Sequence, residues 1–174
     1  MDENYDRRLL DALHARGADP RVAAATRALS WAGEHGAVWI AAGLAGAAVD
    51  GARRERWLRA TALTAGAHAL SIGVKRVVRR PRPGHVTPLV RTAGRHSFPS
   101  SHAASAAAAA VAYWALGSRN ACAVVPLAAA MCVSRLVAGV HWPSDVVAGA
   151  ALGAVTARVG AHMGARRTRA GVPV

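Results

Sequence analysis

Apolar residues gather in five stretches along the chain, and each stretch is nearly free of charged side chains. They are Gly36–Val49, Trp57–Val74, Ala103–Gly117, Ala121–Val140 and Val146–Gly164. No strand alternation or hairpin signal competes with them, so the sequence predicts an all-α fold. Each stretch has 14 to 20 residues, whereas a helix needs roughly 20 to cross about 30 Å of hydrocarbon. We therefore expect an integral membrane bundle of about five helical spans, the shorter ones extended by their flanks.

The first 30 residues show a different pattern. Leu9, Leu10 and Leu13 form an apolar stripe on an otherwise polar helix, and Asp19 and Pro20 are typical of the start of a second short helix. We expect this segment to lie along the membrane interface. At this length a single domain, residues 1–174, is expected. Its parts are the amphipathic segment 1–30, the helical core 31–164 and the basic tail 165–174.

The composition supports a membrane bundle more than a soluble one. With 53% hydrophobic residues and 44 alanines, the chain can bury a core, which excludes a disordered basic arm. Small residues on every face allow helices to pack closely in lipid. The net charge is +13, and the cations, all arginines except one lysine, stand mainly between the apolar stretches. A soluble alanine-rich bundle remains the structural alternative, because several stretches are short for a span.

Acidic residues nearly disappear after Glu55, since the remaining 119 residues contain only Asp145. An isolated carboxylate among so many cations needs a chemical reason. Cys122 and Cys132 are ten residues apart on one expected helix, too far for a disulfide, and no cysteine–histidine spacing indicates zinc.

The first polar cluster is KRVVRRPRP, which runs from Lys75 to Pro83. Helical spacing places Lys75 and Arg79 on one face, and the prolines then end the helix and carry Arg82 back across its end. A solvated basic juncture at the membrane surface is one interpretation. The other is an anion clamp, with lysine as a point charge and arginine as a planar fork on a phosphate.

The second cluster, HSFPSSH, runs from His96 to His102, directly before the alanine-rich stretch. Pro99 and Ser100 are typical of a helix start, with Ser100 as the N-cap. Free N–H groups of Ser100, Ser101 and His102 would also form a phosphate cradle. His102 in the first turn is a candidate for proton transfer.

The third cluster is SRLVAGVHWPSD, from Ser134 to Asp145. Arg135 lies late in the fourth apolar stretch, where an unpaired guanidinium is costly and indicates a functional role. His141 lies in the break before Pro143, which opens the next helix. Asp145 can simply stabilise the start of the next helix through its favourable interaction with the helix dipole. Alternatively, it can accept the Nδ1–H of His141 and leave Nε2 as a nucleophile. The second interpretation explains the isolated acid better.

Together the clusters form the pattern K-x6-R-P, P-S-x-H and S-R-x5-H-x3-D over residues 75–145. This pattern resembles the type 2 phosphatidic acid phosphatase (PAP2) superfamily, which contains lipid phosphatases, acid phosphatases and vanadium haloperoxidases. The apolar stretches match that family's helical membrane core over most of the chain. The family usually has glycine where this chain has Ser101, a change that keeps a backbone N–H donor.

The resemblance implies a role for each matching residue. His141 would attack phosphorus to form a phosphohistidine with Asp145 holding its ring, and His102 would protonate the leaving group and then activate water. The phosphoryl oxygens would be held by the other matching residues, which are Lys75, Arg82, Ser100, Ser101 and Arg135. These groups would stabilise the transition state without a metal ion or other cofactor.

A narrower resemblance concerns the substrate. The run LSWAGEHGAVWIAAGL and the cluster KRVVRRPRP are similar to actinobacterial PAP2 enzymes that act on decaprenylphosphoryl-5-phosphoribose in arabinan precursor synthesis. This implies a lipid phosphomonoester with a polyprenyl or acyl tail in the bilayer. Phosphatidylglycerophosphate and polyprenyl diphosphate are the alternative substrates within the family.

Two other functions compete with lipid phosphate hydrolysis. A net charge of +13 suits a non-enzymatic protein that binds membrane surfaces or nucleic acid. Against nucleic acid as a partner, the cations are scattered and no nucleic-acid-binding signature occurs. A vanadate haloperoxidase is the alternative within the family, and the short chain with its apolar stretches argues against it.

The same pattern bears on topology. Five spans would place the N-terminal segment and both catalytic connectors on one side of the membrane. The cations of the two sides are too evenly balanced for the positive-inside rule, and the N-terminus lacks the charged-then-apolar order of a secretory signal. We expect a multi-pass protein of the cell membrane whose active site faces the cytoplasm.

Overall fold

The computed structural model describes residues 3–92, 94–117 and 121–169. Arg119 and residues 170–174 of the expected basic tail lie outside them. Over the described ranges the chain is helical, without a strand, and the all-α prediction is confirmed. The helices are α1 (Glu3–His14), α2 (Pro20–Ala32), α3 (Ala37–Val49), α4 (Arg54–Val78), α5 (Ser101–Trp114), α6 (Ala121–Val137) and α7 (Pro143–Arg169), with short 3-10 helices η1 (Ala15–Ala18), η2 (Glu34–Gly36) and η3 (Gly51–Arg53).

The five apolar stretches correspond to α3, α4, α5, α6 and α7. Among the described residues, only Pro143–Met163 within α7 is by itself long and apolar enough to cross a membrane, and Ala123–Val137 is a shorter apolar helix. The reason is length, because α3 has 13 residues and α5 has 14, which rise only about 20 Å. Helix α7 continues to Arg169, so the tail expected from residue 165 begins as helix.

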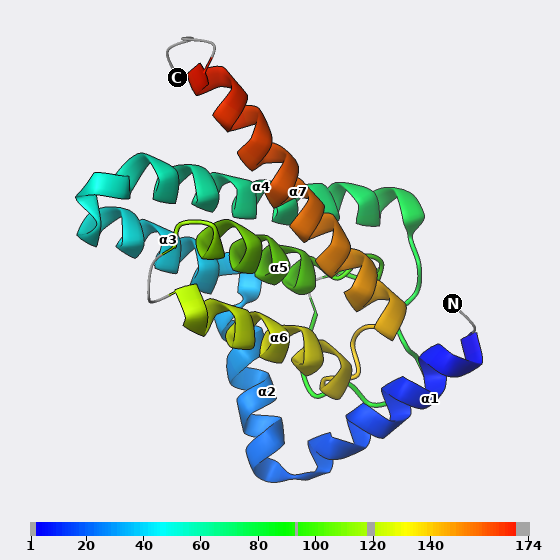
Figure 1. The fold of residues 1–174 in the computed structure, drawn as a ribbon. Coiled ribbons are helices and arrows are strands. Elements are labelled where there is room, and N and C mark those ends of the chain that lie inside the picture. The colour runs from blue at the N-terminus through cyan, green and yellow to red at the C-terminus, as the bar shows by residue number, and fades with distance from the viewer. Residues whose placement is uncertain (1–2, 93, 118–120, 170–174) are drawn as a thin grey trace.

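Helix α5 occupies the centre of the molecule and packs against α4, α6 and α7 (Figure 1). Five of its alanines are fully buried, namely Ala103, Ala104, Ala106, Ala108 and Ala109. A Cβ added at Gly149 or Gly153 of α7 would collide with the carbonyl oxygen of Ser100 or Ala104 of α5. Small residues therefore let the two backbones touch, which is the packing expected for helices in lipid.

Helices α1 and α2 form a V at the end of the bundle where α6 ends and α7 begins (Figure 1). The predicted cap of α2 is confirmed, since the Asp19 carboxylate accepts the N–H of Arg21 at 2.7 Å and Pro20 is the first helical residue. On α1, Leu10 is fully buried in a cluster with Ala103. The apolar stripe of α1 thus packs against the bundle itself.

Candidate active site

The three polar clusters meet at one end of the bundle, where α4 and α6 end and α5 and α7 begin. The backbone N–H of Ser100 donates to the Asp145 carbonyl at 2.9 Å and joins the starts of α5 and α7. Arg79 adopts a left-handed conformation with φ of 53° and ends α4. The connector that follows folds back over the site, where Arg82 Nη1 donates to the Val140 carbonyl at 2.6 Å.

Lys75 and Arg82 both reach this end, as the sequence predicts. Lys75 Nζ donates to the carbonyls of His96 and Ser97 at 3.3 and 3.4 Å. The expectation that Arg79 shares a face with Lys75 is wrong. Arg79 leaves the helical conformation with φ of 53°, so helical spacing does not apply to it; its exposed side chain donates from Nε to the Arg76 carbonyl at 3.0 Å.

His141 is 3% exposed and lies between a cation and a carboxylate. Its Nε2 is 3.4 Å from Arg82 Nη1, and its Nδ1 is 3.6 Å from Asp145 Oδ2, which exceeds hydrogen-bonding distance. Burial lowers the pKa of His141 to about 4; Asp145 acts in the opposite direction, and the charges of Arg82 and Lys75 add to the lowering. At neutral pH the imidazole is therefore uncharged and keeps a lone pair.

Asp145 is fully buried and has more partners than the sequence suggests. Its Oδ2 accepts the backbone N–H of Trp142 at 2.9 Å, so the carboxylate caps the start of α7 in addition to lying beside His141. Its Oδ1 accepts Arg80 Nη1 at 3.0 Å. Arg80, which the sequence analysis did not single out, is thus a direct partner of the isolated acid.

Arg135 and His102 meet on the other side of the site through a residue of α2. Arg135 is 2% exposed; its Nη2 donates to the hydroxyl of Ser30 and, at 3.1 Å, to that of Ser134. His102 Nε2 lies 3.3 Å from the Ser30 carbonyl oxygen. The buried guanidinium predicted from the sequence is therefore paired with hydroxyls, and Ser30 was not anticipated.

The start of α5 differs in one detail from the predicted cradle. The Ser100 hydroxyl accepts the Ala103 N–H at 3.4 Å, which confirms Ser100 as the N-cap. Its own N–H is used by the Asp145 carbonyl, so the expectation that this N–H is free is wrong. The N–H groups of Ser101 and His102 lie in the first turn, where an α-helix supplies no partner of its own.

Three residues at this end escaped the sequence analysis: Asp6, Arg80 and Ser30. A signal existed for Asp6, because it precedes Leu9, Leu10 and Leu13 at helical spacing and so stands on the apolar stripe of α1. A carboxylate on a buried face needs a partner. No such signal separated Arg80 from the neighbouring arginines or marked Ser30.

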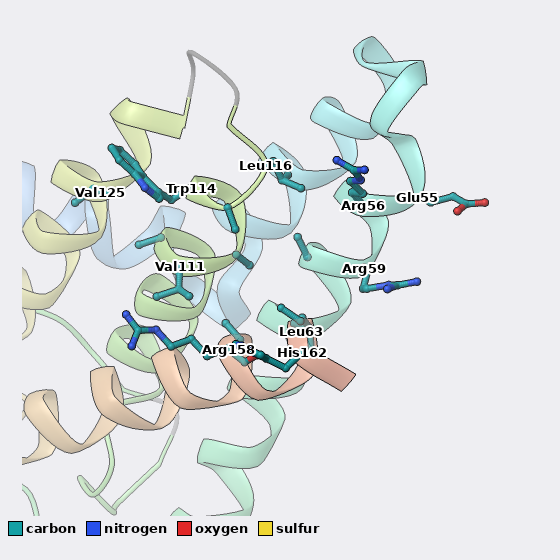
Figure 2. Close-up of a pocket in the computed structure, with 16 residues that line it drawn as sticks. Glu55, Arg56, Arg59, Leu63, Val111, Trp114, Leu116, Val125, Arg158 and His162 are labelled. Atoms are coloured by element: carbon teal, nitrogen blue, oxygen red, sulfur yellow. The ribbon is translucent and has the colours of Figure 1, made fainter. Parts of the chain in front are cut away.

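A large cavity lies at the opposite end of the bundle (Figure 2). Its volume is about 1,110 Å³, and α4, α5, α6 and α7 line it with residues such as Ala115, Trp114 and Ala161. None of the predicted site residues lines it. Buried polar and charged side chains gather instead at the other end, which makes that end the candidate for the chemistry. The described part of the chain holds no group of three His, Cys, Asp or Glu residues arranged for a metal ion.

Comparison with known proteins identifies the family of the chain. A family model described as the PAP2 superfamily matches residues 56–169. The chain belongs to the PAP2 superfamily.

Two relatives are named decaprenylphosphoryl-5-phosphoribose phosphatase. The one from Mycolicibacterium smegmatis is 47% identical over 132 residues, 75% of this chain and 72% of the relative. The one from Mycobacterium tuberculosis is 41% identical over 154 residues, 87% and 85% of the two chains.

More distant PAP2 relatives extend the comparison. The lipid A 1-phosphatase of Rhizobium etli is 35% identical over 88 residues, 46% of this chain and 38% of that protein. The crystal structure of a transmembrane PAP2-type phosphatidylglycerolphosphate phosphatase from Bacillus subtilis has a TM-score of 0.57, with 22% identity, over 93% of this chain and 95% of that one. The chain is thus a phosphoric monoester hydrolase with the fold of a transmembrane PAP2 enzyme.

Proposed function

We propose that this PAP2 phosphatase hydrolyses the 5-phosphate of decaprenylphosphoryl-5-phosphoribose through a phosphohistidine on His141. The observation that carries the mechanism is the surrounding of that ring, with Nε2 beside the Arg82 guanidinium and Nδ1 facing Asp145. The relatives at 41% and 47% identity that are named for this activity support the substrate.

In the first step, His141 Nε2 attacks phosphorus and the bond between phosphorus and the ribose oxygen breaks. The imidazole gains positive charge as the P–N bond forms, and the 3.6 Å separation of Nδ1 from Asp145 Oδ2 contracts to a hydrogen bond. Lys75, Arg82 and Arg135 hold the phosphoryl oxygens with the N–H of Ser101 at the start of α5, and Ser100 shapes that helix start.

In the substrate complex His102 is the imidazolium, because the bound phosphate dianion favours its protonation, and it supplies the proton that the ribose oxygen needs as it leaves. Its Nε2–H, which faces the Ser30 carbonyl in the free enzyme, exchanges this acceptor for the leaving oxygen. In the second step His102 takes a proton from water, and the water oxygen attacks phosphorus. The P–N bond breaks, phosphate leaves and His141 returns to its neutral form. No step needs a metal ion, since the cations neutralise the transition-state charge.

The reaction takes place at a membrane surface in this proposal. Helices α3 to α7 form a multi-pass bundle with the lipid tail of the substrate in the bilayer, and the N-terminal segment lies at the interface on the active-site side. The apolar composition of α7 and the transmembrane PAP2 fold support this arrangement. We place the active site on the cytoplasmic side.

The mechanism is tested by phosphate release from a lipid phosphomonoester in detergent. We expect His141→Ala to abolish turnover and Asp145→Asn to weaken it severely. Radiolabelled phosphate should become bound to the wild-type protein in an alkali-stable, acid-labile form that His141→Ala lacks. A fully active His141→Ala protein would contradict the proposal.

The substrate is tested by comparing three lipids at matched detergent concentration. We expect kcat/KM to be highest for decaprenylphosphoryl-5-phosphoribose, above phosphatidylglycerophosphate and polyprenyl diphosphate. A clear preference for either of the other lipids would replace the proposed substrate and leave the mechanism intact.

The orientation is tested with a single cysteine at position 90, Val90→Cys, in a chain whose two native cysteines are replaced. A membrane-impermeant maleimide should label it in permeabilised but not in intact spheroplasts. Labelling of intact spheroplasts would place the active site outside.

A further inference from the structure

Asp6 is a buried carboxylate that belongs to α1, far from the three motif clusters in sequence. It is 2% exposed, and its Oδ1 accepts the backbone N–H of Ser144 at 3.0 Å. Its Oδ2 accepts one hydrogen bond from the Ser144 hydroxyl and another from Arg80 Nη2, the latter at 3.2 Å. Asp6 thus accepts three hydrogen bonds from two residues near His141, which is more than a surface contact of an amphipathic helix.

The contact with Ser144 caps a helix from outside its own sequence. Ser144 is the second residue of α7, so its N–H has no acceptor within the helix. Asp6 provides that acceptor, while Asp145 provides one for Trp142. Two carboxylates thus stabilise the same helix start, where the dipole favours negative charge.

Arg80 connects these two carboxylates. Its Nη1 donates to Asp145 Oδ1 at 3.0 Å and to the Ser144 hydroxyl at 2.6 Å, while its Nη2 donates to Asp6. The guanidinium also lies over the Trp142 ring, 5.4 Å from its centre. The Arg80 guanidinium is therefore fixed by contacts on several sides, and the Asp145 carboxylate cannot rotate without breaking its hydrogen bond to Arg80.

The charges of the group also matter for the reaction. Arg80 and Asp145 alone would form a neutral pair, whereas Asp6, Arg80 and Asp145 together carry one net negative charge. In the proposed mechanism His141 becomes positively charged when its Nε2 bonds phosphorus. A net negative group behind the ring stabilises that charge, and a neutral pair does so less well.

We propose that Asp6 is a positioning residue of the active site, which acts through Arg80 and Ser144 to orient Asp145 and to keep this group negatively charged behind His141. Helix α1 is then part of the catalytic apparatus. This inference rests on the proposed role of His141 as the nucleophile, and it adds a residue from outside the three motifs.

The kinetic test compares Asp6→Asn with Asp11→Asn on a lipid phosphomonoester. Asp11 is a matched control on the same helix, because it pairs with His85 of the connector at 2.8 Å but is half exposed and makes no contact with Asp145. We expect Asp6→Asn to lower kcat about 10- to 100-fold, the usual cost of removing an outer-shell partner, with KM changed less than about twofold. Asp11→Asn should keep both constants.

Two outcomes would overturn the proposal: a wild-type kcat in Asp6→Asn, or an equal loss of kcat in Asp11→Asn. If Asp6→Asn does not fold, Ser144→Ala serves instead, since it removes only the hydroxyl between Arg80 and Asp6. It should lower kcat about tenfold, and an unchanged kcat in a folded Ser144→Ala protein would count against the proposal. Thermal unfolding in detergent identifies folded variants.

A spectroscopic test separates charge from packing. In 15N-histidine NMR, the titration midpoint of His141 should fall in Asp6→Asn and rise in Arg80→Gln, because the two changes alter the net charge in opposite directions. The other charged or titratable groups near His141 are the same in both variants: Lys75 on α4, Arg82 in the connector, His102 on α5, Arg135 on α6 and Asp145 on α7. Shifts in the same direction, or none, would contradict the charge argument.

The two proposals can fail separately. If wild-type protein releases no phosphate, or His141→Ala stays active, the mechanism fails, and the titration still tests whether Asp6 and Arg80 act on His141. If wild type is active, His141→Ala is inactive and Asp6→Asn keeps its kcat, only the role of Asp6 is lost.

Discussion

The two ends of the bundle are built from the same helices in different ways. At the proposed active-site end, α5 and α7 touch through glycines, and polar side chains such as Arg135, His141 and Asp145 are buried with partners. At the other end the helices enclose the apolar cavity of about 1,110 Å³ (Figure 2), with Arg56, Arg59 and Arg158 among its lining.

The difference indicates which end suits the proposed phosphate site. A phosphate needs fixed charges and N–H donors, which require converging helix ends with little space between them. Hydrocarbon needs volume and apolar walls, which diverging alanine-rich helices provide. Cavity size and buried charge therefore point to different ends, and the proposed phosphate site follows the buried charge.

The strongest contrast is between two arginines, Arg135 at the active-site end and Arg158 at the cavity. Arg135→Ala should lower kcat/KM on the order of 100- to 1,000-fold, because it removes a preorganised donor to the phosphoryl group. Arg158→Ala should stay within about twofold of wild type in the same phosphate-release assay. Equal losses in the two variants would remove the functional distinction between the ends.

The close contact of α5 and α7 predicts a difference in stability. Gly153→Ala forces the backbones apart, because its Cβ would meet the Ala104 carbonyl, and should cost about 1–3 kcal/mol. Gly66→Ala on α4, where nothing lies within 4 Å of the added carbon, should be neutral or stabilise by up to about 1 kcal/mol. Unfolding in detergent measures both, and a neutral Gly153→Ala would contradict the packing argument.

The buried environment of His141 predicts its titration. Its pKa of about 4 lies below the ordinary value of about 6.5, so the neutral ring should persist at pH 5 and be lost only near pH 4. The unfolded chain binds this proton already near pH 6.5, so folding stability should fall as the pH drops from 6.5 toward 4. A 15N-histidine NMR titration, assigned by the signal missing in His141→Ala, checks the midpoint; a value near 6.5 would show an exposed ring.

The smallest effect is expected at the cavity. Ala161→Leu places a larger apolar side chain at the exposed wall of α7 and should change kcat by less than about twofold. A loss of tenfold or more in phosphate release would mean that the two ends are coupled.

The sequence predicted much of this architecture because the relevant signals are local. The five apolar stretches, the cap at Asp19 and the helix starts at Ser100 and Pro143 depend on residues within a turn or two of each other. The candidate site residues were predicted by the same means, since each motif lies at one helix end. One wrong prediction also has a local cause. Arg79 adopts a left-handed conformation that ends α4, and the next residue, Arg80, then donates a hydrogen bond to Asp145.

The amino-acid sequence by itself determined the helices, the apolar character of the bundle and the three clusters that carry the PAP2 pattern, because these depend on spacing along the chain. Only the tertiary structure decided which partners the buried charges have. Ser30 meets Arg135 across 105 positions, and Asp6 meets Ser144 across 138. A buried charge needs a hydrogen-bonding or ion-pair partner, but spacing along the chain does not show which distant residue provides it.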